Sequence, residues 1–188
     1  MDYSQEYLGK LLNVSASSIG MYEQNRRMPN IETLISMCNI FLVSSDYLLE
    51  ISYDRTQYEK PQDSNKISIP QRILLLMEEN ELDISFISSI TKIQRQRLEN
   101  IINEMKTPNI AEVISLAECF GTTSDYILCL TDHKDMNTSK VTVLGDSFPH
   151  RLKTLLDSYT ELEVANGIDI SIAKLRSLLS GSEEPTPS

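Results

Sequence analysis

The sequence predicts an all-α protein built from repeated units, and two observations carry this prediction. Apolar residues recur three and four positions apart, as at Leu8, Leu11 and Leu12, whereas the two-residue alternation of a half-buried strand is nowhere sustained. Residues 28–50 also return 79 positions later as residues 107–129, where ten of twenty-three positions are identical without a gap. A repeat of this kind indicates structural units arranged in tandem.

The composition is that of an ordinary globular chain with an excess of acid. Its 188 residues are 40% hydrophobic, which suits three repeats of about 60–80 residues better than one large domain. No apolar run is long enough to span a membrane, and no signal peptide is evident, so we expect a cytoplasmic protein without membrane contact. The net charge of −10 argues against indiscriminate binding to nucleic acid, so the local distribution of charge must decide.

The residue types needed for catalysis or metal binding do not occur at useful spacings. Cys38, Cys119 and Cys129 form no CxxC pair and are expected to be reduced core thiols. His133 and His150 have no partner at a ligand spacing. Phosphate-binding loops, nucleophile elbows and metalloprotease motifs are absent from the sequence. We therefore expect no enzymatic activity, no metal, no cofactor and no evident small-molecule ligand.

Two polar stretches without helical periodicity, residues 53–66 and 131–147, indicate linkers between the units. The predicted organisation is a unit at 1–54, a linker at 55–66, a unit at 67–133, a linker at 134–148 and a unit at 149–188. The middle unit is expected to hold five short helices, near 69–80, 83–90, 94–102, 110–119 and 124–129.

The first and third units are incomplete against the middle one. The first has no counterpart of residues 69–80, and the third stops about where its fourth helix would begin. Losing one amphipathic helix removes roughly 8 kcal/mol of apolar burial, which rivals the about 5–15 kcal/mol that stabilises a small domain. Either other segments supply the missing surfaces or the sequence is a piece of a longer array.

Residues 4–29 have the layout of a helix-turn-helix. Leu8, Val14, Ile19 and Tyr22 are spaced to lock two short helices into a crossing. The small polar residues 15–18 then face outward on a helix slim enough for a major groove about 12 Å wide.

In these residues the chain resembles the Xre family of helix-turn-helix regulators, which includes the lambda repressor and Cro-like domains. The matching residues are Ser4-Gln5, Leu8-Gly9, Leu12 to Ser15, Ser17 to Ile19, Tyr22-Glu23, Arg27, Pro29, Glu32 to Leu34, Val43-Ser44 and Asp46 to Leu49. The resemblance is strongest in the first unit and weaker in each later one. It implies compact five-helix units whose third helix reads DNA. The sequence departs from the family at Gly9, where alanine is usual, and this glycine is expected to lower the helix propensity modestly.

Carried over position by position, the resemblance assigns roles in DNA binding. In the first unit these residues are Gln5 for a phosphate, Ser15, Ala16, Ser17 and Ser18 for bases, and Asn25, Arg26 and Arg27 for the backbone. In the second unit they are Lys92, Gln94, Arg95, Gln96, Arg97 and Lys106. In the third unit they are Ser171, Lys174 and Arg176, next to two carboxylates, Glu183 and Glu184, that should weaken phosphate binding.

The second unit carries the densest basic cluster in an otherwise acidic segment. Residues 67–133 hold five Lys or Arg and ten Asp or Glu, yet Arg95 and Arg97 fall together on the groove-facing positions. Gln and Arg can bond bidentately to adenine and guanine edges. The alternative is an exposed, solvated helix face that happens to be basic. If this cluster binds DNA, Arg95 and Arg97 are expected to be exposed and to contribute little to stability. Arg72 is expected to take no part in DNA binding.

The sequence thus favours a sequence-specific DNA-binding transcriptional regulator whose partner is double-stranded DNA, with homo-oligomerisation possible. Tandem units would replace part of a symmetric dimer. The alternative is a helix-turn-helix-derived protein-interaction module without DNA binding, whose docking faces would be the helices that contain Tyr47 and Tyr126. Either tyrosine is expected to be core or partner-facing. Fold resemblance alone does not separate these functions.

Overall fold

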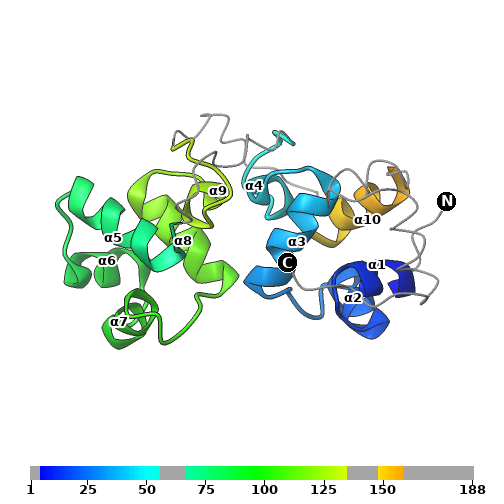
Figure 1. The fold of residues 1–188 in the computed structure, drawn as a ribbon, viewed down its shortest axis with the longest axis horizontal. Helices are drawn as coiled ribbons and strands as arrows, with labels where there is room; N and C mark the ends of the chain where they lie inside the picture. The colour runs from blue at the N-terminus through cyan, green and yellow to red at the C-terminus, as the bar shows by residue number, and fades with distance from the viewer. Residues whose placement is uncertain (1–4, 56–66, 135–147, 159–188) are drawn as a thin grey trace.

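The structure is a computed structural model that describes residues 5–55, 67–134 and 148–158. All regular structure in these ranges is helical, so the all-α prediction is confirmed for them. None of their helices has the length and apolar character needed to cross a bilayer. The helices form two groups, seen side by side in Figure 1: a central group of residues 67–134, and an N-terminal group of residues 5–55 joined by residues 148–158.

The central group contains the five helices that the sequence predicts there, with bounds that differ by two residues or fewer. They are α5 (Ile69–Glu79), α6 (Ile84–Thr91), α7 (Arg95–Ile102), α8 (Ile110–Phe120) and α9 (Ser124–Ile127). Capping explains two of the starts. Ser68 and Gln71 form a capping box on α5, and Asn109 and Glu112 form one on α8, so backbone N–H groups without helical partners are satisfied.

The N-terminal group repeats this backbone. Its helices are α1 (Gln5–Leu11), α2 (Ala16–Glu23), α3 (Ile31–Phe41) and α4 (Ser45–Leu48). The starts of α2, α3 and α4 lie 79 residues before those of α7, α8 and α9, since 95 − 16, 110 − 31 and 124 − 45 all equal 79. Residues with positive φ obey the same offset, at Asn13 and Lys92, Asn25 and Glu104, Leu42 and Gly121, Glu50 and Cys129. The two groups therefore share their turns as well as their helices.

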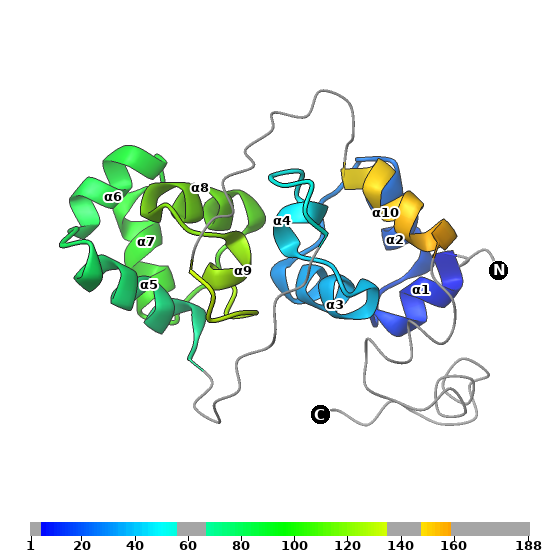
Figure 2. The same ribbon diagram turned by 90° about the horizontal axis from the view of Figure 1, so that it is seen from above.

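Helix α10 (Phe148–Ser158) occupies the place in the N-terminal group that α5 occupies in the central group. Its start lies 79 residues after that of α5, since 148 − 69 = 79, and it packs against α2 and α4 as α5 packs against α7 and α9 (Figure 2). Phe148, Leu152 and Leu155 are buried in this contact. Another segment of the chain thus supplies the surface that the sequence of residues 1–54 lacks. The remainder of the predicted third unit, residues 159–188, lies outside the described residues.

An arginine on each of these two helices fastens it to its group. The guanidinium of Arg151 lies 4.7 Å from the ring centre of Tyr47 and donates to the carbonyl oxygens of Tyr47 and Ser52. The guanidinium of Arg72 lies 4.0 Å from the ring centre of Tyr126, and its Nη2 donates to Asp132 at 2.7 Å. Cation–π contacts of this kind gain strength where water is excluded. Both tyrosines therefore serve packing within their own group.

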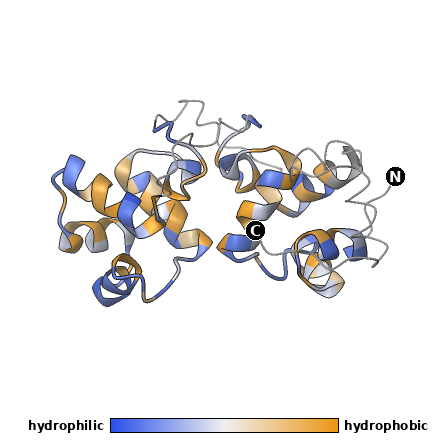
Figure 3. Ribbon diagram, viewed as in Figure 1, coloured by the Kyte–Doolittle hydropathy of each residue, from blue (hydrophilic) through white to orange (hydrophobic). Residues whose placement is uncertain are grey.

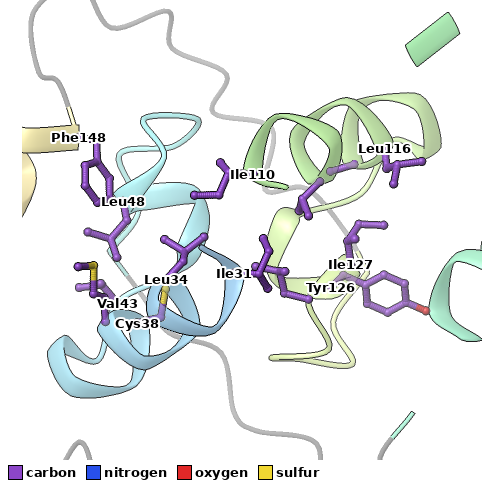
Figure 4. Close-up of a cluster of buried hydrophobic side chains, with 14 of the residues drawn as sticks. Ile31, Leu34, Cys38, Val43, Leu48, Ile110, Leu116, Tyr126, Ile127 and Phe148 are labelled. Atoms are coloured by element: carbon purple, nitrogen blue, oxygen red, sulfur yellow. The ribbon is translucent and has the colours of Figure 1, made fainter. Parts of the chain in front are cut away.

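The two groups meet through α4 and α9 in a reciprocal contact. The backbone N–H of Ser45 donates to Asp125 Oδ1 at 2.8 Å, and the N–H of Ser124 donates to Asp46 Oδ1 at 2.9 Å. Asp46 and Asp125 are themselves 79 residues apart. Because each side gives and receives the same bond, the contact has the form of a twofold, isologous interface within a single chain. Figure 4 shows buried apolar side chains around it, with Ile31 and Ile110 between the groups.

The reciprocal contact holds two carboxyl groups away from water. Burial, against the lowering effect of the Ser45 N–H bond and together with repulsion from Asp46, raises the pKa of Asp125 to about 6. Burial likewise raises the pKa of Asp46 above its ordinary value. The second oxygen of Asp125, Oδ2, is buried without a hydrogen-bond partner among the described residues. Ionisation at this contact therefore opposes the association of the two groups.

We predict that Leu152→Ala destabilises the N-terminal group by about 2–5 kcal/mol, because it opens a cavity under α10. The matched substitution in the central group is Ile73→Ala, at the equivalent position of α5. Lys153→Ala, on the exposed side of α10, is the control and should change stability by about 0.5 kcal/mol or less. Urea unfolding of the full chain measures all three. An equal response of Leu152→Ala and Lys153→Ala would contradict the assignment of α10 to the N-terminal group.

We also predict an unusual pH dependence from Asp125. Since its pKa is raised in the folded chain from 3.8 to about 6, the folded state binds more protons than the unfolded state between these values. The stabilisation is therefore present at the acid end and lost as the pH rises through this window, by on the order of 1–3 kcal/mol. Asp125→Asn keeps the acceptor of the Ser45 N–H without the charge. The difference in unfolding free energy between parent and variant, measured from pH 4.5 to 7.5, should move in favour of the variant as the pH rises. A constant difference would show that Asp125 titrates normally.

Candidate nucleic-acid interface

Helices α1 and α2 form the predicted helix-turn-helix. Leu8, Ile19 and Tyr22 are buried and Val14 is half-buried, so the residues expected to lock the crossing do so. Asn13 makes the turn in the left-handed region, with φ 53°.

Gly9 has a packing role in the N-terminal group beyond the modest loss of helix propensity expected from the sequence. A Cβ atom there would lie 2.8 Å from the carbonyl oxygen of Val14, closer than such atoms approach. Ser88 stands at the equivalent position of the central group, where its Oγ donates to the Ile93 carbonyl at 2.7 Å. The two motifs thus close the same turn in different ways.

The outward residues of α2 are small, and not all of their hydroxyls are available. Ser15 Oγ accepts the N–H of Ser18 at 3.0 Å as the N-cap of α2, and it lies 2.9 Å from Ser18 Oγ. Ala16 and Ser18 are half-buried. Ser17 is exposed, and its hydroxyl makes no hydrogen bond within the described ranges. Of the four residues expected to face bases, Ser17 is the hydroxyl best placed to do so.

Gln5 ties the start of α1 to the end of α2. Its Nε2 donates to Glu23 Oε2 at 2.6 Å, and its Oε1 lies 3.0 Å from where a Cβ on Gly20 would be. The side chain is exposed at the helix start. A phosphate contact through this amide, as the resemblance implies, would compete with the bond to Glu23.

The loop after α2 presents two exposed arginines. Asn25 turns the chain with φ 55°, and Arg26 and Arg27 follow it on the exposed surface. Their backbone N–H groups donate to the Met21 carbonyl, but neither guanidinium group makes a hydrogen bond or ion pair with any part of the chain that the structure describes. Exposed, unpaired guanidinium groups are free to bind an anion, and they lose no internal bond in doing so.

The corresponding surface of the central group is richer in long polar side chains. Gln94 and Gln96 are exposed, and Arg95 donates to Glu99 at 2.9 Å and to Ser85 Oγ at 3.1 Å. Lys92 Nζ donates to the Ser89 carbonyl at 2.7 Å. Lys106, in the loop after α7, is exposed. Figure 3 shows α7 as hydrophilic over much of its length, at the lower left of the view.

Arg97 is half-buried and serves the fold, whereas the sequence suggested an exposed side chain. Its Nε and Nη2 donate to the two oxygens of Glu112 at 2.7 and 2.8 Å, and Nη2 also donates to the Thr107 carbonyl. Burial alone would raise the pKa of Glu112, but the bonds from Arg97 and from the Asn109 N–H hold it below its ordinary value. The ion pair therefore connects α7 to the capping box of α8.

Helices α2 and α7 lie on the same side of the molecule. Figure 1 shows both at the lower edge, with the loops that follow them on that edge and the α4–α9 contact above. Two exposed helix surfaces of mixed polar and basic character thus face one direction. The third set of predicted residues, Ser171, Lys174 and Arg176, falls outside the described residues. No group of three or more His, Cys, Asp or Glu suited to a metal ion occurs in the ranges described.

We predict that Arg97→Ala destabilises the chain by about 1–3 kcal/mol, because it leaves Glu112 without its charged partner at a half-buried site. The matched control is Arg95→Ala, which removes a more exposed ion pair and should cost about 0.5 kcal/mol or less. Thermal or urea unfolding of both variants at neutral pH provides the measurement. Equal stability of the two variants would mean that the Arg97–Glu112 pair contributes nothing to the fold.

Comparison with known proteins supports the helix-turn-helix. Residues 1–48 match the sequence profile of a helix-turn-helix family. The HTH-type transcriptional regulator ImmR of Bacillus subtilis (strain 168) is 28% identical over 111 residues, which cover 55% of this chain and 86% of the relative. No solved structure matches the chain significantly. Neither similarity is to an enzyme, in agreement with the expectation from sequence. At the level of the family, the chain is similar to helix-turn-helix transcriptional regulators.

Proposed function

We propose that the chain is a sequence-specific DNA-binding transcriptional regulator in which α2 and α7 each enter a major groove of one duplex. The observation that carries the proposal is their position: both helices lie on one side of the molecule, each following a helix-turn-helix turn (Figure 1). An α-helix fits the major groove of B-DNA, where each base pair shows a distinct pattern of donors and acceptors.

The base-reading chemistry is concentrated on α7. Gln94 and Gln96 are exposed and can bond to the N6 and N7 atoms of adenine. Arg95 can bond to O6 and N7 of guanine if it releases Glu99, an exchange of one exposed, screened ion pair for a contact in the groove. Arg97 is held by Glu112 and Thr107, so its contribution is to fix the orientation of α7.

Phosphate binding is assigned chiefly to the loops after the reading helices. Arg26 and Arg27 are exposed and their guanidinium groups have no partner among the described residues, and Lys106 holds the equivalent place of Arg27 in the central group. Such contacts fix the register of the protein on the duplex but carry no sequence information. With a chain charge of −10, they must act at short range.

The alternative is a protein-interaction module without DNA binding. The docking faces first considered for it, α4 and α9, contact each other and are not free. What favours this alternative instead is α6, where Phe86 and Ile90 are 48% and 54% exposed and one helical turn apart. A measurement of DNA binding separates the two functions.

A mobility-shift titration of the full chain on duplex DNA at several salt concentrations tests the proposal. We predict a log–log slope of about −3 to −6, from roughly −0.9 per neutralised phosphate. The variant carrying Arg26→Ala and Arg27→Ala should show a slope smaller in magnitude by about 1–2, because two phosphate contacts are lost. Lys153→Ala, which removes one positive charge from the exposed side of α10, is the control and should leave the slope unchanged. No salt-dependent binding by the parent chain would leave the interaction module as the function.

We further predict that Arg95→Ala weakens binding to a selected duplex by about 1–3 kcal/mol and relaxes the preference at one base position, because a guanine contact is removed. Competition between selected and random duplexes measures both effects. Since Arg72 and Arg97 are tied into the fold, neither is a suitable control, and Lys153→Ala again serves. Uniform weakening on all sequences would assign Arg95 to the phosphate backbone.

A further inference from the structure

We infer that one copy of the chain binds two unlike half-sites in inverted orientation, with α7 reading sequence in one and the N-terminal group gripping mainly the backbone of the other. This inference rests on the proposed function. It follows from two observations that are independent of each other: the symmetry of the contact between the groups, and the difference between their reading surfaces.

The symmetry is set by the bonds between α4 and α9. Ser45 donates to Asp125 at 2.8 Å, and Ser124 donates to Asp46 at 2.9 Å. Ser45 and Asp46 are the equivalents of Ser124 and Asp125, so each group uses the same Ser-Asp surface in the contact. Groups related by a translation along the chain would instead join two different surfaces. A local twofold axis therefore runs through this contact and leaves the molecule between α2 and α7, which lie together on the opposite side (Figure 1).

A twofold relation of the reading helices fixes the orientation of their half-sites. B-DNA has local twofold axes perpendicular to its own axis, and reading helices related by a twofold axis contact half-sites of inverted orientation about one turn apart. In the usual case two identical chains form that symmetry. Here the self-complementary surface is closed within one chain, so a second copy is not needed to create it.

The two reading surfaces differ in what they offer to DNA. At equivalent positions α7 and its cap carry Gln94, Arg95, Gln96 and Arg97, whereas α2 and its cap carry Ser15, Ala16, Ser17 and Ser18. Short hydroxyl side chains make fewer bidentate bonds to base edges than Gln or Arg. Sequence discrimination is therefore expected beneath α7.

The loops after these helices show the opposite bias. The N-terminal group has Asn25, Arg26 and Arg27, with both arginines exposed and unpaired in the described residues. The central group has Glu104, Met105 and Lys106 in the same places. The N-terminal loop thus has two guanidinium groups, whereas the central loop has one ammonium group and one carboxylate. Binding to the DNA phosphate backbone is therefore expected mainly beneath the N-terminal group.

Selection of duplexes from a random library with the full parent chain gives the first readout. We expect one defined motif of a few base pairs, and hydroxyl-radical footprinting of the selected duplex should show two protected patches on one face, about one helical turn apart. Sedimentation should give one chain per duplex. Protection of a single patch, or two chains per duplex, would overturn the inference while leaving DNA binding intact.

Grafting the residues of the α7 surface onto α2 tests the relative orientation of the two half-sites. The double variant Ala16→Arg and Ser17→Gln places the residue types of Arg95 and Gln96 on α2 and keeps the Ser15 cap. Repeating the selection should yield the parental motif plus a second, related motif in inverted orientation at fixed spacing. A second motif in direct orientation, or none, would overturn the inference.

Two controls separate the possible failures. The helical signal and melting temperature of the grafted chain establish that it is folded, and the footprint of the parent tests the same arrangement without any substitution. If the parent chain neither selects a motif nor binds with salt dependence, the proposed function itself fails. Salt-dependent binding without any selected motif would refute both the inference and the sequence specificity of the proposed function. A selected motif with only one protected patch, or with two chains per duplex, overturns the inference alone.

Discussion

The hydrogen bonds between Asp46 and Ser124, and between Asp125 and Ser45, set how the molecule is arranged. Each carboxylate takes a backbone N–H in the first turn of the other group's short helix, where the partial positive charge of the helix end favours an anion. Geometry therefore favours this contact, whereas the burial of two carboxyl groups opposes it. The balance fixes the relative orientation of two helix groups, and with it the side on which α2 and α7 stand (Figure 1).

The same internal repetition explains how the N-terminal group is stabilised. Residues 1–54 lack an opening helix, yet α10, which follows the central group in sequence, fits against α2 and α4. It fits because it repeats the pattern of α5: Arg151 corresponds to Arg72, Leu152 to Ile73 and Leu155 to Leu76. The order of these helices along the chain therefore differs from their order in space. Repeats relax the usual tendency of neighbouring elements to pack together.

The periodic apolar residues were enough to predict the all-α class and the five helices of the central group, because helix periodicity and caps such as Asn109 are local properties. The place of α10 and the reciprocal bonds of Asp46 and Asp125 were not predictable, since both depend on contacts across about 80 to 100 residues. In the candidate site, the exposure of Arg26 and Arg27 followed from their polar loop. The pairing of Arg97 with Glu112 was not predicted, although the repeat offered one signal. Both members of the pair differ in the N-terminal group, where Ser18 stands in place of Arg97 and Thr33 in place of Glu112, so neither charge is present there.

This pairing shows how an acidic chain can hold basic residues for two different purposes. Three arginines donate to oxygen atoms inside their own group and are engaged in holding the fold together: Arg72, Arg97 and Arg151. The guanidinium groups of Arg26 and Arg27 have no partner within the described residues. A formal count of arginines therefore overstates the charge available to an anionic partner, and position matters more than number. Arg26 and Arg27 follow α2, whereas the long polar side chains Gln94, Arg95 and Gln96 lie at the start of α7, so the two groups share a backbone arrangement and differ in surface chemistry. Two helix groups within a single chain can differ in this way, whereas the two members of a symmetric pair of identical chains cannot.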